Sequence, residues 1–132
     1  MDEYGITYGR GYAYSLQYHI VWCVSQNLPI LIGDIHTIVA QSISDTLQGL
    51  DIVPIVAEVN PTYVHLVVSC KPQNKISDVV KILKGNSARK VFMRDSAVKT
   101  TNHLSHLWHN SYLVFSHRYD YKQIIDAYMK QL

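Results

Sequence analysis

Two apolar stretches, residues 52–59 and 63–70, are separated only by Asn60-Pro61-Thr62, and this spacing constrains the fold more than any other feature of the chain. Both stretches are rich in β-branched residues, and 63–70 can be divided into two alternating sets, which predicts two strands. Because the turn is so short, the two strands should pair antiparallel. The later strand then presents two faces, one with Val64, Leu66, Val68 and Cys70 and the other with Tyr63, His65, Val67 and Ser69.

The rest of the chain adds strands and helices on both sides of this pair. Alternation predicts a first strand over 14–24 as the first ordered element. Helical spacing predicts a helix over 34–49 capped by Asp34, a second one capped by Ser77 or Asp78, and a last one opened by Asp120 and Gln123 in a capping box. A polar loop is expected over 95–106 and a fourth strand over 108–116. The order predicts one α+β domain over 1–132, a ferredoxin-like βαββαβ antiparallel sheet with helices on one face plus a C-terminal helix.

Composition and cysteine usage predict a cytoplasmic protein that does not contact membranes. No apolar run approaches the roughly 20 residues that a membrane span needs. The N-terminus lacks a basic region followed by an apolar stretch, so no signal peptide is expected. Cys23 and Cys70 both lie in apolar segments and are predicted to be reduced and buried.

Positive charge is concentrated in one segment. The net charge is +2, but residues 71–99 hold eight basic and two acidic residues, so this segment carries +6 and the rest of the chain −4. A basic segment on an acidic chain favours a polyanion partner, and the alternative is a solvated helix face. The candidate nucleic-acid contacts on the second helix are Lys81, Lys84, Arg89 and Lys90.

Polar side chains gather on the face of the sheet that the helices leave open. Strand parity places His19, Glu58, Tyr63 and His65 there. Imidazoles and a carboxylate can form a divalent-metal site, while the alternative is a set of ordinary polar residues on a half-exposed sheet. Tyr128 follows the apolar stripe of the last helix, and by pattern alone it is a packing residue.

Several segments, in this order, resemble one family. Tyr18–Cys23 is similar to its first strand, Glu58–Val68 to the segment that holds its HUH motif (histidine, bulky apolar residue, histidine), and Leu83–Arg89 to its basic helix. Leu107–Tyr112 is similar to its fourth strand, and the last helix to the one that carries its nucleophile. From about Gly11 onward the chain thus resembles the single-tyrosine HUH transposases of the insertion sequence 200/605 type, which are transposase A-like.

The resemblance implies a homodimer that binds hairpins in single-stranded DNA and then cleaves and rejoins strands. A tyrosine of the last helix attacks a DNA phosphate and forms a 5′-phosphotyrosine link. A divalent ion, Mg²⁺ or Mn²⁺, is held by the two motif histidines and a polar residue of the last helix. By position, Tyr128 corresponds to the nucleophile and His65 to the second motif histidine. A phenol with a pKa near ~10 needs such activation.

The chain departs from the family pattern at the metal ligands. Tyr63 stands at the first histidine of the motif, which is therefore degenerate, and a neutral phenol is a weak ligand for these ions. The third ligand falls at Leu132, with Gln131 one place off. His19 and Glu58 could complete a metal site with His65. These changes predict impaired chemistry.

Two other interpretations stay open. The first is a catalytically inactive or repurposed protein that binds DNA or RNA hairpins through the basic helix. The second is an unrelated ferredoxin-like domain, either an RNA-recognition fold or a small-ligand regulator. It ranks last because an RNA-recognition sheet displays clustered aromatic residues, and Tyr63 is the only aromatic with open-face parity on the first or third strand.

Overall fold

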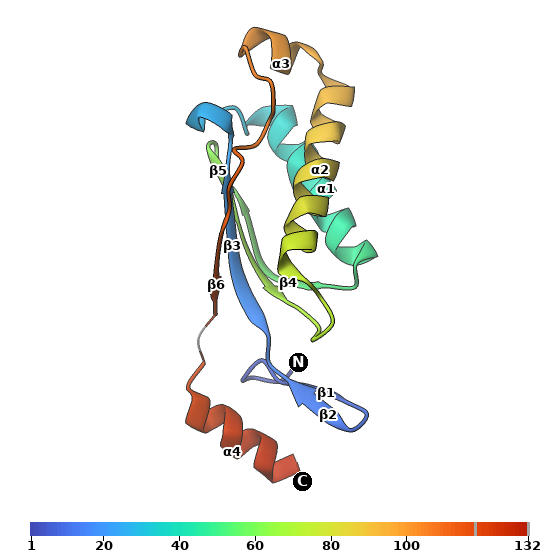
Figure 1. The fold of residues 1–132 in the computed structure, drawn as a ribbon, viewed down its shortest axis with the longest axis vertical. Helices are drawn as coiled ribbons and strands as arrows, with labels where there is room; N and C mark the ends of the chain where they lie inside the picture. The colour runs from blue at the N-terminus through green and yellow to red at the C-terminus, as the bar shows by residue number, and fades with distance from the viewer. Residues whose placement is uncertain (118, 132) are drawn as a thin grey trace.

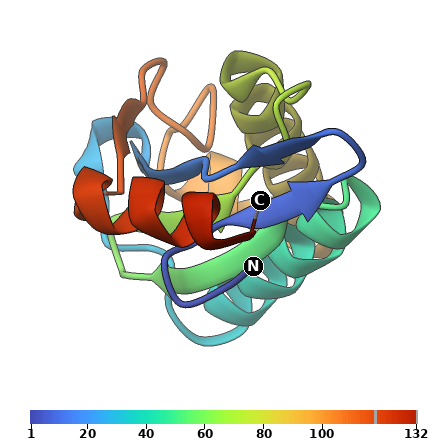
Figure 2. The same ribbon diagram turned by 90° about the horizontal axis from the view of Figure 1, so that it is seen from below.

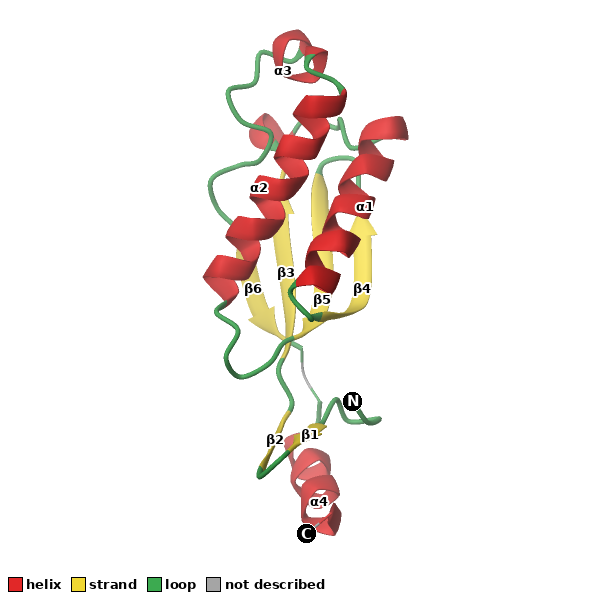
Figure 3. Ribbon diagram, turned by 90° about the vertical axis from the view of Figure 1, so that its right-hand side faces the viewer, coloured by secondary structure: helices red, strands yellow, loops and turns green. Residues whose placement is uncertain are grey.

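The core of the protein is a four-stranded antiparallel sheet covered by two helices on one face (Figure 1). The computed structural model describes residues 1–117 and 119–131. The sheet has the order β4-β5-β3-β6 and consists of β3 (Gln17–Cys23), β4 (Val53–Val59), β5 (Tyr63–Ser69) and β6 (Leu113–Ser116). Its cover is formed by α1 (Gly33–Gly49) and α2 (Ile76–Arg94), as Figure 3 shows. The ferredoxin-like prediction is confirmed.

Strand alternation and helical spacing together explain the core. Five inward residues of β3 and β5 are at most 1% exposed and meet the apolar stripes of α1 and α2, while Tyr18 is partly buried against them. Val39 and Ile43 of α1 and Leu83 of α2 fill the space opposite them. Because alternate residues of a strand point to opposite faces, the same registers that bury this face hold the other face open. The inward strand residues that are at most 1% exposed are Ile20, Trp22, Val64, Leu66 and Val68.

A hairpin at the N-terminus, β1 (Thr7–Gly9) and β2 (Tyr12–Tyr14), was not predicted. Strands of three residues are too short for alternation to be visible in the sequence. The hairpin is held to the sheet by Gln17, whose buried amide donates to the carbonyl of Gly5 at 2.7 Å. Gly5 has φ +74°, and a Cβ there would meet the Gln17 side chain at 2.7 Å, so only glycine fits this contact.

Two of the predicted helix caps are wrong, and a short helix was missed. The N-cap positions are Ile32 for α1 and Lys75 for α2, neither of which makes a side-chain cap, so Asp34 and Asp78 instead lie in the first helical turn. Carboxylates there still interact favourably with the positive end of the helix. The loop after α2 contains α3 (Ala97–Thr101), and a 3-10 turn (Ser25–Asn27) follows β3.

The fourth strand is shorter than predicted because Trp108 belongs to the core. Trp108 makes only an isolated bridge with Val24, and the chain is irregular until β6 begins at Leu113. The indole nitrogen of Trp108 donates to the carbonyl of Lys84 at 3.1 Å and to Ser87 Oγ at 3.0 Å. The segment 107–112, which resembles a strand of the family, is therefore mostly a loop anchored on α2.

The last helix, α4 (Tyr121–Gln131), lies beyond the end of the sheet, beside the β1–β2 hairpin (Figures 1 and 2), rather than across the open face. The Asp120 half of its predicted capping box is confirmed, since the Asp120 carboxylate accepts a hydrogen bond from the Lys122 backbone at 2.9 Å. None of its described residues is buried.

The cysteine prediction holds for one of the two positions. Both cysteines are free; Cys70 is buried, and burial raises its pKa to about 11, whereas Cys23 is exposed at the end of β3. Strand parity explains the difference, because Cys23 points to the open face. Within residues 1–117 and 119–131, no helix combines the length and the apolar character that a bilayer crossing requires.

Candidate active site

Three histidine rings stand in a row on the open face of the sheet. His65 Nε2 lies 2.9 Å from His19 Nδ1, and His19 Nε2 lies 3.0 Å from His117 Nδ1. At the other end, the Glu58 carboxylate lies 3.5 Å from His65 Nδ1. We call these four residues the histidine ladder. Side chains from β4, β5, β3 and the residue after β6 are thus connected across the whole sheet.

Strand register explains why these side chains meet. Glu58 is directly opposite His65, and His19 is diagonal to His65 because Val21 takes the position opposite it. The nearest side chains on one sheet face are direct and diagonal neighbours. The prediction that His19, Glu58 and His65 share the open face is therefore confirmed by their contacts.

The ladder is linear, and its protons can all point one way. The His19 and His65 rings are coplanar within 7°, and their centroids are 5.2 Å apart. This centroid separation equals the 2.9 Å distance between the two nitrogens plus the radii of the two imidazole rings. The two nitrogens therefore point directly at each other. A carboxylate only accepts, so His65 Nδ1 donates to Glu58 and His65 Nε2 accepts from His19. By the same logic His19 Nε2 accepts from His117.

The surroundings of His19 disfavour its charged form. Desolvation lowers the pKa of His19, and the neighbouring His65 and His117 lower it further. Because both ring nitrogens are already engaged, a second proton would break one ladder contact.

This lowered pKa predicts acid sensitivity. A histidine whose folded pKa lies below its unfolded value contributes stability above about pH 6.5, and this stability is lost as the pH falls below that value. The melting temperature should therefore fall between pH 7.5 and 5.5, and the fall should be smaller in His19→Phe. His65, His117 and Glu58 face His19, so the matched control is His106→Phe, which changes an exposed ring elsewhere. Equal pH dependence in the two variants would contradict the assignment.

As arranged, the ladder does not fit one divalent ion. Ligands of a metal must direct their lone pairs at a common point, whereas the imidazole nitrogens here point at each other. Among the residues that the structure describes, no group of three or more histidine, cysteine or carboxylate side chains is placed to hold a metal. A metal site made of His19, Glu58 and His65 stays a prediction that requires the ladder to open.

Tyr63, at the degenerate motif position, lies on the same face two residues before His65. It is opposite Cys23 in the strand register and is 38% exposed. Tyr63 therefore shares the open face of the sheet with the ladder.

Tyr128 lies on α4, where it lines an apolar pocket of about 320 Å³ between this helix and the N-terminal hairpin. The pocket is also lined by Ile6, Tyr14 and Met129. Tyr128 is 39% exposed, so its side chain is neither buried in the core nor fully exposed to solvent. Gln131 is exposed at the end of α4, and Leu132 lies outside the described residues. The structure thus joins His65, His19 and Glu58 but places Tyr128 beside the hairpin.

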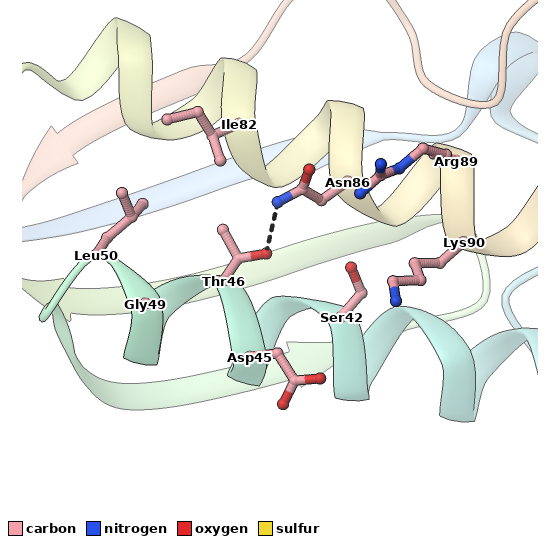
Figure 4. Close-up of a pocket in the computed structure, with 9 residues that line it drawn as sticks. All are labelled: Ser42, Asp45, Thr46, Gly49, Leu50, Ile82, Asn86, Arg89 and Lys90. Carbon is pink, nitrogen blue, oxygen red and sulfur yellow. Dashed lines mark hydrogen bonds between the residues drawn. The ribbon is translucent and has the colours of Figure 1, made fainter.

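The four basic residues predicted to bind nucleic acid lie on two sides of α2. Arg89 and Lys90 line a groove of about 310 Å³ between α1 and α2, which Asp45 also lines (Figure 4). Lys81 and Lys84 line a larger groove of about 640 Å³ between α2 and the loop 105–110. One flat surface cannot contact all four.

Lys84 also has a structural contact. Its ammonium donates to the carbonyl of His109 at 2.6 Å and lies 3.5 Å from that of Ser111. Burial lowers the pKa of Lys84. This lysine therefore fixes the loop before β6 on α2, in addition to any role toward a ligand.

His117, the fourth member of the ladder, was not predicted from the sequence. His117 has the parity of Phe115, which lies opposite His19, and its backbone donates to the carbonyl of Gln17 at 2.8 Å. Continuing the alternation of the fourth strand one step past residue 116 would have placed it on the open face.

Solved structures define the class of fold as that of transposases. A crystal structure of a protein from Deinococcus radiodurans R1 that is assigned as a transposase matches with a TM-score of 0.79 and 31% identity, over 95% of this chain and 96% of that one. The REP-associated tyrosine transposase bound to a REP hairpin matches with a TM-score of 0.59 and 11% identity, over 91% of this chain and 67% of that one, which shows the fold alone.

The sequence places the chain within one family of that class. Residues 12–132 match the family described as transposase IS200 like. The ISDra2 transposase TnpA of Deinococcus radiodurans is 39% identical over 114 residues, which cover 82% of this chain and 77% of that protein. The chain belongs to the IS200-like transposases, so the resemblance to this family is confirmed. The β1–β2 hairpin begins outside the family match.

Proposed function

We propose that this chain binds hairpins in single-stranded DNA and that its capacity to cleave and rejoin strands through Tyr128 is impaired. The proposal rests on one observation: at the position of the metal site the chain has a tyrosine, Tyr63, and a His65 whose two nitrogens are already engaged. In the intact reaction the Tyr128 oxygen bonds to a DNA phosphorus, the phenol proton leaves, and the departing strand ends in a 3′-OH. A divalent ion, where a family member binds one, stabilises charge on that phosphate.

The hairpin partner is supported by the groove between α2 and the loop 105–110. Lys81, Lys84, His106 and His109 line it, and its described lining contains no acidic residue. The groove between α1 and α2 instead includes Asp45. A groove lined by cations without carboxylates suits a phosphate backbone better. We therefore place the nucleic acid on the side of Lys81. RNA hairpins have the same phosphate chemistry and are the alternative ligand.

This placement predicts that two lysines of one helix behave differently. Lys81→Ala should weaken hairpin binding and lower the slope of log K against log salt by about 1. Lys90→Ala is the matched control, because it removes the same charge from the other side of α2. Binding is measured by fluorescence anisotropy with a labelled hairpin from the flanks of the gene, at several salt concentrations. If Lys90→Ala weakened hairpin binding more than Lys81→Ala, the interface would instead lie at the groove between α1 and α2.

A homodimer is the second part of the proposal. Ile125 and Met129 of α4 are 52% and 61% exposed beside Tyr128, and Leu113 and Phe115 of the edge strand β6 are 57% and 46% exposed. Apolar stripes of this kind on a helix and an edge strand are typical of protein contacts. A second copy of the chain can cover them.

Light scattering after size exclusion tests the dimer. The native protein should elute at twice the 15.1 kDa of one chain. Ile125→Asp combined with Met129→Asp should shift it toward one chain, because a charge cannot be buried in an apolar contact without a large cost. Ile32→Asp, at a residue 59% exposed on another part of the surface, should leave the mass unchanged. A native mass of one chain would refute the dimer.

A denaturing gel tests the proposal as a whole. The native protein is incubated with the labelled hairpin and Mn²⁺, beside Tyr128→Phe. Binding in the native gel without a covalent adduct in the denaturing gel is the expected result. An adduct that forms with the native chain and disappears in Tyr128→Phe would show intact chemistry, and loss of hairpin binding would refute the proposed ligand.

A further inference from the structure

We infer that His19 occupies Nε2 of His65 while Glu58 engages Nδ1, so that a histidine restored at position 63 does not by itself rebuild a divalent-metal site. The inference uses the position of Tyr63 in the family motif, and it concerns the protein without DNA. It therefore stands or falls independently of hairpin binding.

Both ring nitrogens of His65 are engaged. With Nδ1 donating toward the Glu58 carboxylate, the lone pair of Nε2 is directed at the N–H of His19 at 2.9 Å. If the protons were reversed, Nε2 would itself carry a hydrogen. In both cases this nitrogen has no lone pair available for an ion. Opening of the His19–His65 contact must precede coordination.

His19 is held in place by three contacts, of which the hydrogen bond to His65 is the first. Its ring is stacked on Phe115, with centroids 4.4 Å apart and planes within 5°. Its other nitrogen contacts His117 at 3.0 Å. Rotation of His19 away from His65 would therefore also disturb the stack and the contact with His117.

The ions themselves compete poorly for an imidazole nitrogen. Mg²⁺ and Mn²⁺ prefer oxygen ligands and bind imidazole weakly. An ion that gains only weak imidazole ligands is a poor competitor for the His65 nitrogen when three contacts hold His19. A second imidazole at position 63 adds a ligand but leaves the existing hydrogen bond in place. His19 therefore acts as an internal competitor of the metal.

The test measures Mn²⁺ binding by the electron paramagnetic resonance signal of the free ion, with the full chain and no DNA. Four proteins are compared: native, Tyr63→His, Tyr63→His with His19→Phe, and Tyr63→His with His117→Phe. Phenylalanine at position 19 retains a ring against Phe115 but has no nitrogen. Removal of His117 takes away one contact that holds His19 but keeps the hydrogen bond between His19 and His65, so this double variant is the matched control for the loss of a neighbouring histidine.

The native protein and Tyr63→His should bind Mn²⁺ equally weakly, and the affinity of the His117 double variant should stay closer to theirs than to that of the His19 double variant. The His19 double variant should bind it about 10-fold more tightly or better, a step comparable to the effect of residues that orient a metal ligand. Equal affinity of Tyr63→His and the His19 double variant would overturn the inference. So would a His19 double variant that folds, as judged by circular dichroism, and binds no better than the native protein.

A second measurement needs no variant. Long-range ¹⁵N–¹H spectra of the native protein report which nitrogen of each histidine carries the proton and whether it is hydrogen-bonded. His65 is expected as the Nδ1–H tautomer, with a hydrogen-bonded N–H of His19 directed at its Nε2. A His65 ring that is free to titrate and exchange tautomers would overturn the inference.

Discussion

Trp108→Ala is expected to destabilise the protein by about 3–5 kcal/mol, the range for removing a large aromatic side chain from a packed core. Trp108 is 5% exposed and meets Trp22 edge to face, with ring centroids 5.8 Å apart. It also closes the gap between α2 and the strand end at Val24. The truncation leaves a cavity and removes the anchor of the loop before β6.

The contributions of the ring and its N–H can be separated. Trp108→Phe keeps most of the apolar contact and removes one donor from the carbonyl of Lys84, which still lies 3.2 Å from the Ser87 hydroxyl, so it should cost about 0.5–1.5 kcal/mol. The Ser87 hydroxyl loses the indole N–H as a donor but keeps a hydrogen bond of its own, because it donates to the carbonyl of Leu83 at 2.7 Å. Urea unfolding followed by circular dichroism gives the values. Tyr121→Ala, at a residue 67% exposed, should stay within about 0.5 kcal/mol. If Trp108→Ala were as mild as this control, the anchor would be refuted.

The central part of the sheet could be predicted from the sequence because it depends on neighbouring residues: a short turn and the alternation along each strand. The tripeptide between 52–59 and 63–70 fixes an antiparallel pair, and a period of two fixes which residues share a face. These two facts placed Glu58 and His65 together, and parity on the first strand added His19. None of this required knowledge of distant contacts.

The parts that could not be predicted depend on contacts between distant segments. The role of His117 follows from the register of β6 on β3, which pairs Phe115 with His19 across nearly a hundred residues. The position of α4 depends on the hairpin β1–β2, whose three-residue strands are too short to be recognised from alternation in the sequence. The sequence showed that Ile125 and Tyr128 share a stripe but not the surface beside which this stripe lies.

The candidate roles of Tyr128 and Tyr63 come from the family resemblance and could not be predicted from residue patterns or packing. By spacing alone Tyr128 is a packing residue, and its contact with the N-terminal hairpin fits that interpretation. Only the family match, now confirmed, gives reason to test it as a nucleophile. The same match turns Tyr63 from an ordinary strand residue into a departure from a motif.

Restoring one histidine and removing another should change the outcome of the covalent assay. With Mn²⁺ and the labelled hairpin, Tyr63→His combined with His19→Phe should form a Tyr128–DNA adduct that the native protein and Tyr63→His alone do not form. Charge stabilisation by a bound metal is worth several kcal/mol, on the order of 100-fold in rate or more, so the gain should be visible on a denaturing gel. The adduct must vanish when Tyr128→Phe is added to the double variant, which identifies the nucleophile. It must also vanish when a chelator replaces Mn²⁺, since otherwise the gain has another cause.

Two outcomes of this assay would contradict the expected result, and each points to a different cause. If the double variant binds Mn²⁺ and the hairpin but forms no adduct, Tyr128 does not reach the phosphate, and the position of α4 beside the hairpin β1–β2 becomes the limiting feature. Deleting residues 1–11, which lie before the family match, should then release the helix and raise adduct formation. If Tyr63→His alone forms as much adduct as the double variant, the hydrogen bond from His19 does not restrain His65, and the degenerate motif position is by itself the whole of the defect.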